Sequence, residues 1–105
     1  MLMIQEATIA EVGRRIAEAA PSARTYVFGS HARGDAGPRS DLDILVIEPE
    51  VGNPAEEAIR LRRALRGLGV ATDIVVTSER EAEEWREVRG SIIHAALADG
   101  RPLGA

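Results

Sequence analysis

The segment from Tyr26 to Val46 reads YVFGSHARGDAGPRSDLDILV, two apolar runs separated by a polar stretch. The first run, Thr25 to Phe28, is short, aromatic and β-branched, which predicts a buried strand that ends at the turn Gly29-Ser30. Residues 31–40 contain two glycines, two arginines and a proline, so they predict a loop. Leu42 to Glu48 predicts a second strand, and its unbroken apolar run indicates cover on both faces of a sheet.

Helical patterns alternate with strand patterns in the rest of the chain. Residues 7–20 carry apolar side chains at helical spacing, and Pro21 ends the pattern. The other predicted elements are a helix that Asn53 caps and Gly67 or Gly69 ends, a strand over residues 70–77, a helix from the capping box Ser78-x-x-Glu81 to Val88, and a helix over residues 91–98. Strands that alternate with helices predict an α/β fold with a small sheet.

The composition excludes several classes of site. The 105 residues suffice for one domain, residues 1–105, and no repeat or linker divides them. The absence of cysteine excludes disulfides and thiolate nucleophiles, and all 13 basic residues are arginine, which excludes a P-loop lysine and a Schiff base. The net charge of −4 argues against stable nucleic-acid binding by charge. Without a signal peptide or a long apolar run, we expect a cytoplasmic protein that does not span a membrane.

Three carboxylates stand in unusual positions. Asp41 and Asp43 begin the second strand two residues apart, so both project from one face, and Asp73 lies inside the next strand. Each alone has a structural explanation: a turn cap, a solvent-facing strand end, or an arginine partner. If the strands are neighbours, however, the three cluster and repel one another unless a cation joins them. Hard oxygen ligands on a rigid sheet suit Mg²⁺, and two such ions can clamp a phosphoryl transfer.

Gly29-Ser30 supplies a candidate phosphate site. Glycine at a strand end lets a phosphate approach the backbone, and the serine hydroxyl with nearby amides can donate to its oxygens. Arg33 is a further candidate phosphate contact, with pairing to Asp35 as the alternative. We expect Ser40 to orient the turn before the carboxylates rather than to contact substrate.

The spacing Gly29-Ser30, ten residues, Asp41-Leu42-Asp43 resembles the signature of the DNA polymerase beta nucleotidyltransferase superfamily. The flanking residues Tyr26 to Asp35 and Ser40 to Val46 look like the minimal nucleotidyltransferase (MNT) branch. Asp73 matches as the third carboxylate, and the resemblance covers most of the chain. It implies a DNA polymerase beta-like fold, with a small mixed β-sheet flanked by helices.

The resemblance also implies roles for the motif residues. Gly29 and Ser30, with Arg33, would bind the nucleotide phosphates. Asp41, Asp43 and Asp73 would be the catalytic carboxylates and would bind two Mg²⁺ ions. An acceptor hydroxyl would attack the α-phosphate of ATP and release pyrophosphate.

We expect no separate acceptor-binding domain in 105 residues, so the acceptor surface would come from another polypeptide, another copy of the chain or a small molecule that enters an open cleft, and we expect a hetero-oligomer. Free-standing MNT proteins resemble the antitoxin of HEPN–MNT toxin–antitoxin pairs, which implies transfer of AMP to a tyrosine of a HEPN toxin. Two alternatives remain: an antitoxin that neutralises by binding alone, and a transferase that acts on a small hydroxylated molecule. For His31 we expect a surface role, for His94 a structural or interface role, and for Trp85 a core edge or a partner contact.

Overall fold

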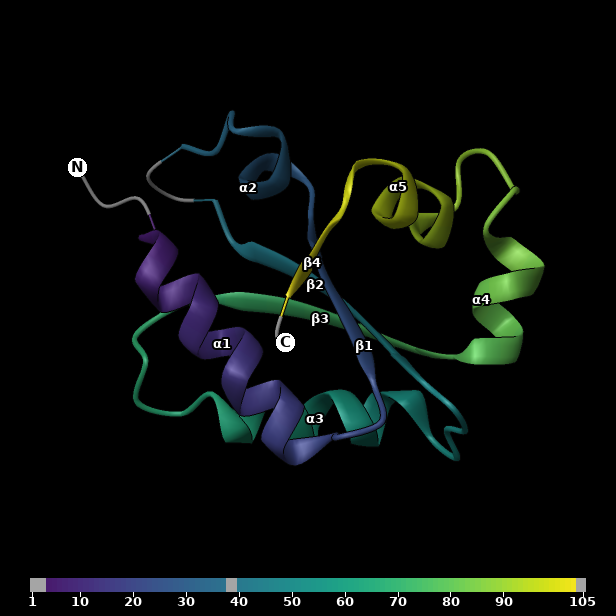
Figure 1. The fold of residues 1–105 in the computed structure, drawn as a ribbon, viewed down its shortest axis with the longest axis horizontal. Coiled ribbons are helices and arrows are strands. Elements are labelled where there is room, and N and C mark those ends of the chain that lie inside the picture. The colour runs from purple at the N-terminus through teal and green to yellow at the C-terminus, as the bar shows by residue number, and fades with distance from the viewer. Residues whose placement is uncertain (1–3, 38–39, 104–105) are drawn as a thin grey trace.

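The computed structural model describes residues 4–37 and 40–103 (Figure 1). In chain order its elements are α1 (Glu6–Ala19), β1 (Arg24–Phe28), α2 (Ser30–Arg33), β2 (Leu42–Glu48), α3 (Pro54–Ala64), β3 (Thr72–Ser78), α4 (Glu79–Trp85), α5 (Ile92–Asp99) and β4 (Arg101–Leu103). The strands form one sheet in the order β3-β2-β1-β4. The predicted α/β fold with a small mixed sheet is confirmed.

Strand directions follow from the connections. β1 runs antiparallel to both β2 and β4, whereas β2 and β3 are parallel and are joined through α3. A parallel pair needs such a crossover, because a short turn cannot return the chain to the same end of the sheet. The start of β2, the start of β3 and the end of β1 therefore lie at one end of the sheet.

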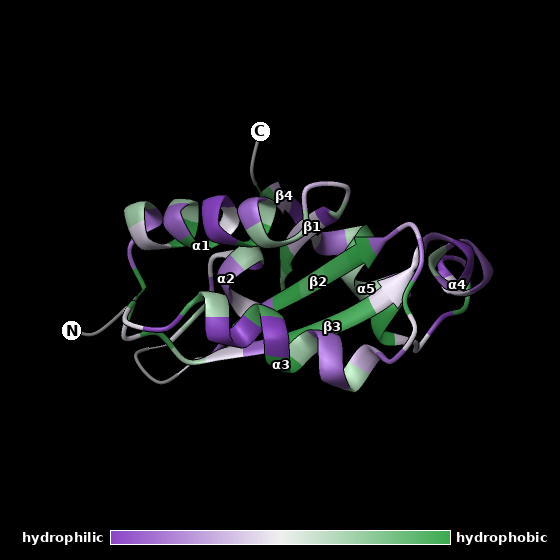
Figure 2. Cartoon of the chain, turned by 90° about the horizontal axis from the view of Figure 1, so that it is seen from below, coloured by the Kyte–Doolittle hydropathy of each residue, from purple (hydrophilic) through white to green (hydrophobic). Residues whose placement is uncertain are grey.

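Helices cover both faces of the sheet. Ile44 and Val46 of β2 pack in one cluster with α1 and α3, and Leu45 and Ile47 pack in a second with α4 and α5. All four side chains are fully buried, as the unbroken apolar run of β2 predicts. Figure 2 shows the hydrophobic colour along β2 and β3 between the more polar helices.

Side-chain caps begin three of the helices. The Asn53 side chain accepts a hydrogen bond from the Glu56 amide at 3.0 Å, which confirms the predicted start of α3. Ser78 Oγ likewise accepts from the Glu81 amide at 3.1 Å, and Ser91 Oγ caps α5. Only half of the predicted capping box forms, because Glu81 accepts from the Thr77 hydroxyl instead.

Two short elements differ from the sequence prediction. Residues 31–40 were expected to be a loop, but Ser30–Arg33 forms the single helical turn α2 between Gly29 and Gly34, both with positive φ. The tail forms β4, which pairs with β1. Pro102 is tolerated there because β4 is an edge strand. β3 begins at Thr72 and α4 ends at Trp85, both within a few residues of expectation.

Among the described residues, no helix is both long enough and apolar enough to cross a membrane.

Candidate active site

The three candidate carboxylates gather at one end of the sheet. Asp43 in β2 and Asp73 in β3 are direct partners in the parallel register, so neighbouring-strand spacing of about 4.8 Å separates their backbones. Asp41 precedes β2 by one residue and lies two residues before Asp43, on the same side of the strand. Asp43 is half-buried, and the other two are exposed. β2 and β3 are thus neighbours in the sheet, which is the condition for the carboxylates to cluster.

Gly29 brings the end of β1 against Asp43. Its φ of 72° and ψ of −149° belong to a region that is essentially restricted to glycine. A Cβ atom at this position would overlap Asp43 Oδ2. Gly29 is therefore required both for the turn into α2 and for the position of the Asp43 carboxylate.

Burial and neighbouring negative charges both act on the Asp43 carboxylate. Burial raises the pKa of Asp43 above its usual value, and the carboxylates of Asp73 and Asp41 raise it further. His31 and Arg33 act in the opposite direction, with smaller effects. The ionised site is thus short of positive charge, which a bound cation would supply.

The donor set fits a hard divalent cation. In the described part of the chain, no three histidine or acidic side chains converge closely enough to enclose an ion as they stand. Asp41 and Asp73 are exposed, however, so their side chains are free to turn toward Asp43. Carboxylate oxygens alone, on strands held in register, are ligands that suit Mg²⁺ rather than a soft metal.

The loop between α2 and β2 is tied back to α2 by His31. The His31 Nε2 atom lies 3.1 Å from the Ser40 carbonyl oxygen, immediately before Asp41. Ser40 Oγ in turn accepts from the Gly37 amide at 3.0 Å, so Ser40 orients the turn as expected. The sequence indicated only a surface role for His31, because its contact spans nine residues and leaves no local pattern.

Arg33 lies in α2, within electrostatic range of Asp43. Its Nε donates to Asp35 Oδ2 at 3.2 Å, and both side chains are at least half exposed. An exposed pair of this kind contributes little stability, so Arg33 can exchange Asp35 for a phosphate at small cost.

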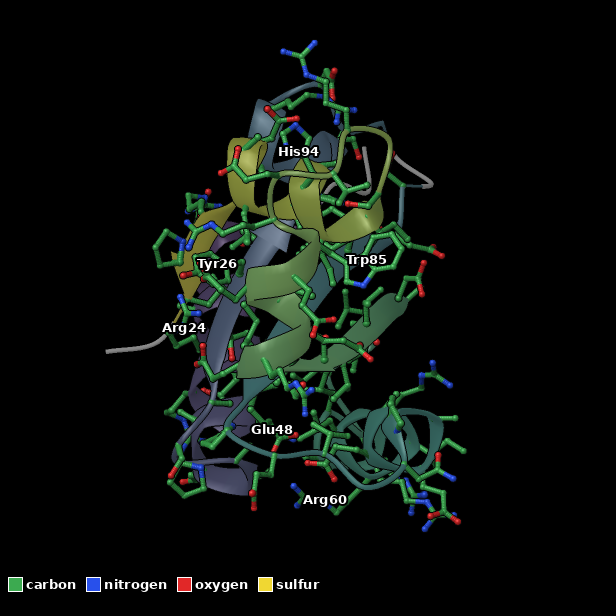
Figure 3. All side chains as sticks on the ribbon, turned by 90° about the vertical axis from the view of Figure 1, so that its right-hand side faces the viewer. Arg24, Tyr26, Glu48, Arg60, Trp85 and His94 are labelled. Atoms are coloured by element: carbon green, nitrogen blue, oxygen red, sulfur yellow. The ribbon has the colours of Figure 1, made fainter. Side chains whose placement is uncertain are left out.

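His94 lies in α5 and Trp85 is the last residue of α4 (Figure 3). His94 Nδ1 lies 2.8 Å from the Arg86 carbonyl oxygen, and its amide donates to the Ser91 cap. These bonds give His94 the structural role that the sequence left open. Trp85 is 46% exposed.

Comparison with known families places this geometry. The protein family described as "Nucleotidyltransferase domain" matches residues 9–98 of the chain. The chain belongs to the nucleotidyltransferase domain family. The matched range contains the motif on α2, β2 and β3, so in this nucleotidyltransferase the carboxylate end of the sheet is the candidate active site.

Solved structures agree with the family. A protein assigned as a minimal nucleotidyltransferase is 36% identical, with a TM-score of 0.65, over 96% of this chain and 97% of its own. A protein from Sulfolobus solfataricus assigned as a nucleotidyltransferase is 26% identical, with a TM-score of 0.61, over 91% of this chain and 76% of its own.

A third structure, a toxin–antitoxin with AMP-PNP, is 23% identical with a TM-score of 0.60, over 97% of this chain and 74% of its own. At that identity the likeness shows the fold alone. No curated protein matches the sequence of this chain.

Proposed function

We propose that this nucleotidyltransferase transfers AMP from ATP to a tyrosine hydroxyl of a HEPN-type toxin and thereby acts as its antitoxin. The observation that carries the transfer chemistry is the register pairing of Asp43 with Asp73, with Gly29 packed against the Asp43 carboxylate. This places an acidic pair beside a glycine turn where a nucleotide phosphate can approach the backbone.

Each motif residue has a distinct task in this proposal. Gly29 and Ser30 hold the β- and γ-phosphates, and Arg33 leaves Asp35 to add a bidentate contact. Asp41, Asp43 and Asp73 hold two Mg²⁺ ions. Those ions neutralise the phosphate charge and polarise the reacting oxygens when they are bound.

The transfer step needs only ATP and the acceptor hydroxyl as reactants. The acceptor oxygen forms a bond to the α-phosphorus, and its proton passes to the Asp73 carboxylate. The bond from the α-phosphorus to the bridging oxygen breaks, and pyrophosphate leaves on the side of Gly29 and Ser30. Positioning and charge neutralisation account for catalysis of this kind.

The choice of a toxin as acceptor has separate support. The fold likeness to a toxin–antitoxin structure with AMP-PNP favours a pair of this type. We therefore propose a hetero-oligomer with a HEPN toxin in the cytoplasm. Its gene is expected beside this one and is expected to encode an all-helical protein with an Arg-x4-His motif.

A neutralisation assay tests this function. The toxin is expressed in cells with the wild-type protein or with the double variant Asp41→Asn and Asp43→Asn, and growth is followed. We expect growth only with the wild type. If the double variant neutralises equally well, binding alone is the mechanism. A second assay uses α-labelled ATP. If the label appears on a low-mass product instead of the toxin, the acceptor is a small molecule.

A further inference from the structure

An apolar groove lies beside the candidate active site. It runs between β3 and the α4–α5 region, has a volume of about 410 Å³, and is lined by Val75, Trp85, Ile92 and Ile93, with Glu81 as its only charged lining side chain. Val75 follows Asp73 by two residues in β3, so the two share a face of the sheet about 7 Å apart. The apolar groove thus begins two residues along β3 from Asp73, on the same face of the sheet.

Exposed apolar side chains concentrate at this groove. In the part of the chain that the structure describes, the exposed large hydrophobic residues are Trp85, Val88, Ile92 and Ile59. Trp85 is 46% and Ile92 54% exposed, and both line the apolar groove. Figure 3 shows the Trp85 ring at the margin of the molecule, beside α4 and above β3. Exposed apolar clusters of this kind mark binding surfaces.

The two hydroxyl groups that line the apolar groove already have partners. The Thr77 hydroxyl donates to Glu81 Oε2 at 3.0 Å. Ser91 Oγ donates to the Val88 carbonyl at 2.8 Å and accepts from the His94 amide at 3.0 Å. A polyhydroxylated small molecule would have to compete for these hydroxyl groups, whereas apolar side chains would leave their bonds intact.

The geometry of transfer indicates what enters the groove. Attacking and leaving oxygens lie roughly in line through the α-phosphorus. Pyrophosphate leaves toward Gly29, at the end of β1, and Asp43 of β2 lies between β1 and β3 in the sheet. The acceptor must therefore arrive from the side of β3, which is the side of the apolar groove.

We infer that the apolar groove is the docking site for the acceptor polypeptide, and that it receives apolar side chains that flank the acceptor tyrosine. This inference rests on the proposed function and narrows it to a protein acceptor. β3 is an edge strand, so an extended segment can also lie along it. Trp85 is the anchor of the site, because a partly exposed tryptophan contributes strongly to protein interfaces.

Fluorescence of Trp85 provides a direct test, because it is the chain's single tryptophan. The probes are two synthetic peptides with one central tyrosine, flanked in one peptide by leucines and in the other by serines. We expect the leucine-flanked peptide to shift Trp85 emission to shorter wavelength and the serine-flanked peptide to leave it unchanged. Ile92→Ser should weaken the binding of the leucine-flanked peptide about tenfold.

Ile59→Ser is the matched control. Ile59 is 47% exposed but lies on α3, on the opposite face of the sheet. Binding by this variant should equal that of the wild type. The inference is overturned if no shift occurs, if both peptides bind equally, or if Ile59→Ser weakens binding as much as Ile92→Ser. A shift of Trp85 emission with ATP and Mg²⁺ alone would overturn it too and assign the groove to the nucleobase. A wild-type dimer that Ile92→Ser abolishes would likewise overturn it and assign the groove to a second copy of the chain.

Label transfer separates this inference from the proposed function. If the leucine-flanked peptide binds at Trp85 but never receives label from α-labelled ATP, the transfer proposal fails and the docking site stands. If both peptides are labelled with equal KM and Trp85 emission does not move, the docking site fails and transfer stands. Asp43→Asn should bind the leucine-flanked peptide normally and transfer nothing.

Discussion

At the scale of single residues, Gly29 connects the backbone of the turn to the charge of the site. Its φ is 72°, and a residue with a side chain would adopt this backbone conformation only at a substantial cost in energy. The Asp43 carboxylate occupies the space that a Cβ atom would take. A single glycine therefore shapes the turn into α2 and leaves the space that the Asp43 carboxylate occupies, beside the proposed phosphate site.

Gly29→Ala should lose both stability and transfer activity. The backbone conformation costs about 1–3 kcal/mol for alanine, and the new methyl group displaces the Asp43 carboxylate. Urea unfolding and the rate of AMP transfer measure the two losses. Gly34→Ala is the control: Gly34 also has a positive φ, of 84°, but no atom lies within 4 Å of its added Cβ. That variant should lose about 1 kcal/mol of stability and keep its activity. Equal activities of the two variants would contradict the role of Gly29.

Asp43→Asn should stabilise the metal-free protein while it abolishes transfer. Because the folded state raises the pKa of Asp43, ionisation of this group above its usual pKa of 3.8 costs stability, and asparagine cannot ionise. Thermal unfolding in metal-free buffer at neutral pH should give a higher Tm than the wild type. Transfer should fall about a hundredfold or more. Asp99→Asn, at the exposed last residue of α5, makes the same chemical change and should do neither. A lower Tm for Asp43→Asn would contradict the repulsion described here.

At the scale of secondary-structure elements, a second acidic cluster connects β2 to α3 at the end opposite the candidate active site. Glu48 Oε2, at the end of β2, is buried and has no hydrogen-bond partner among the described residues. Burial raises the pKa of Glu48 to about 7, and the neighbouring Glu57 contributes. Hydrogen bonds from Arg60, with a smaller effect of Glu48, lower the pKa of Glu57 to about 2. A protonated Glu48 can donate to Glu57, which Arg60 holds ionised at 2.7 Å.

Stability should therefore depend on pH through Glu48. A raised folded-state pKa contributes stability that is complete below about 4.5 and lost as pH rises through about 7. The free energy of unfolding of the wild type should fall across this window, by less than the one-proton limit of about 1.4 kcal/mol per pH unit. Glu48→Gln, whose amide also donates to Glu57, should reduce this slope to the part that the raised pKa of Asp43 contributes. The exposed Glu50→Gln should keep the full slope. Identical slopes in Glu48→Gln and the wild type would show that another group titrates.

Elements with a strong sequence pattern could be predicted, and elements formed by tertiary contact could not. Asn53 and Ser78 begin helices in the structure as their side-chain chemistry predicts. The turn α2 was missed because one helical turn of polar residues has no periodicity. β4 was missed because three residues with a proline become a strand only by pairing with β1. The pairing of Asp43 with Asp73 depends on the strand order, which local patterns do not determine, so the clustering could be predicted only if the two strands were neighbours.

At the scale of the whole molecule, the sheet arranges the three proposed binding sites in sequence across its strands. β1 ends at the proposed phosphate site, β2 carries Asp43 at the centre, and β3 carries Asp73 and then Val75, which lines the apolar groove. A nucleotide and an acceptor can thus approach the carboxylates from opposite sides. The apolar groove could not be predicted from the sequence, because its walls come from β3 and from both helices that follow it.

Nucleotide binding should stabilise the folded protein as a whole. A non-hydrolysable ATP analogue with Mg²⁺, at about 100 times its Kd, should add about 2.7 kcal/mol to the free energy of unfolding. Thermal unfolding measures the gain. The double variant Asp41→Asn and Asp43→Asn, and the wild type with the analogue and a chelator, should gain much less. A full gain without Mg²⁺ would contradict the carboxylates' role as metal ligands.

The most direct test of nucleotidyl transfer at Asp41, Asp43 and Asp73 is to follow which phosphate of ATP remains on the acceptor. The protein is incubated with Mg²⁺, the partner encoded beside it, and ATP labelled at either the α- or the γ-phosphate. We expect the α-label to be bound covalently to a tyrosine of the partner, the γ-label to leave as pyrophosphate, and Asp43→Asn to give neither. A γ-label on the partner, or an unlabelled partner that the wild type nonetheless binds and silences, would contradict nucleotidyl transfer.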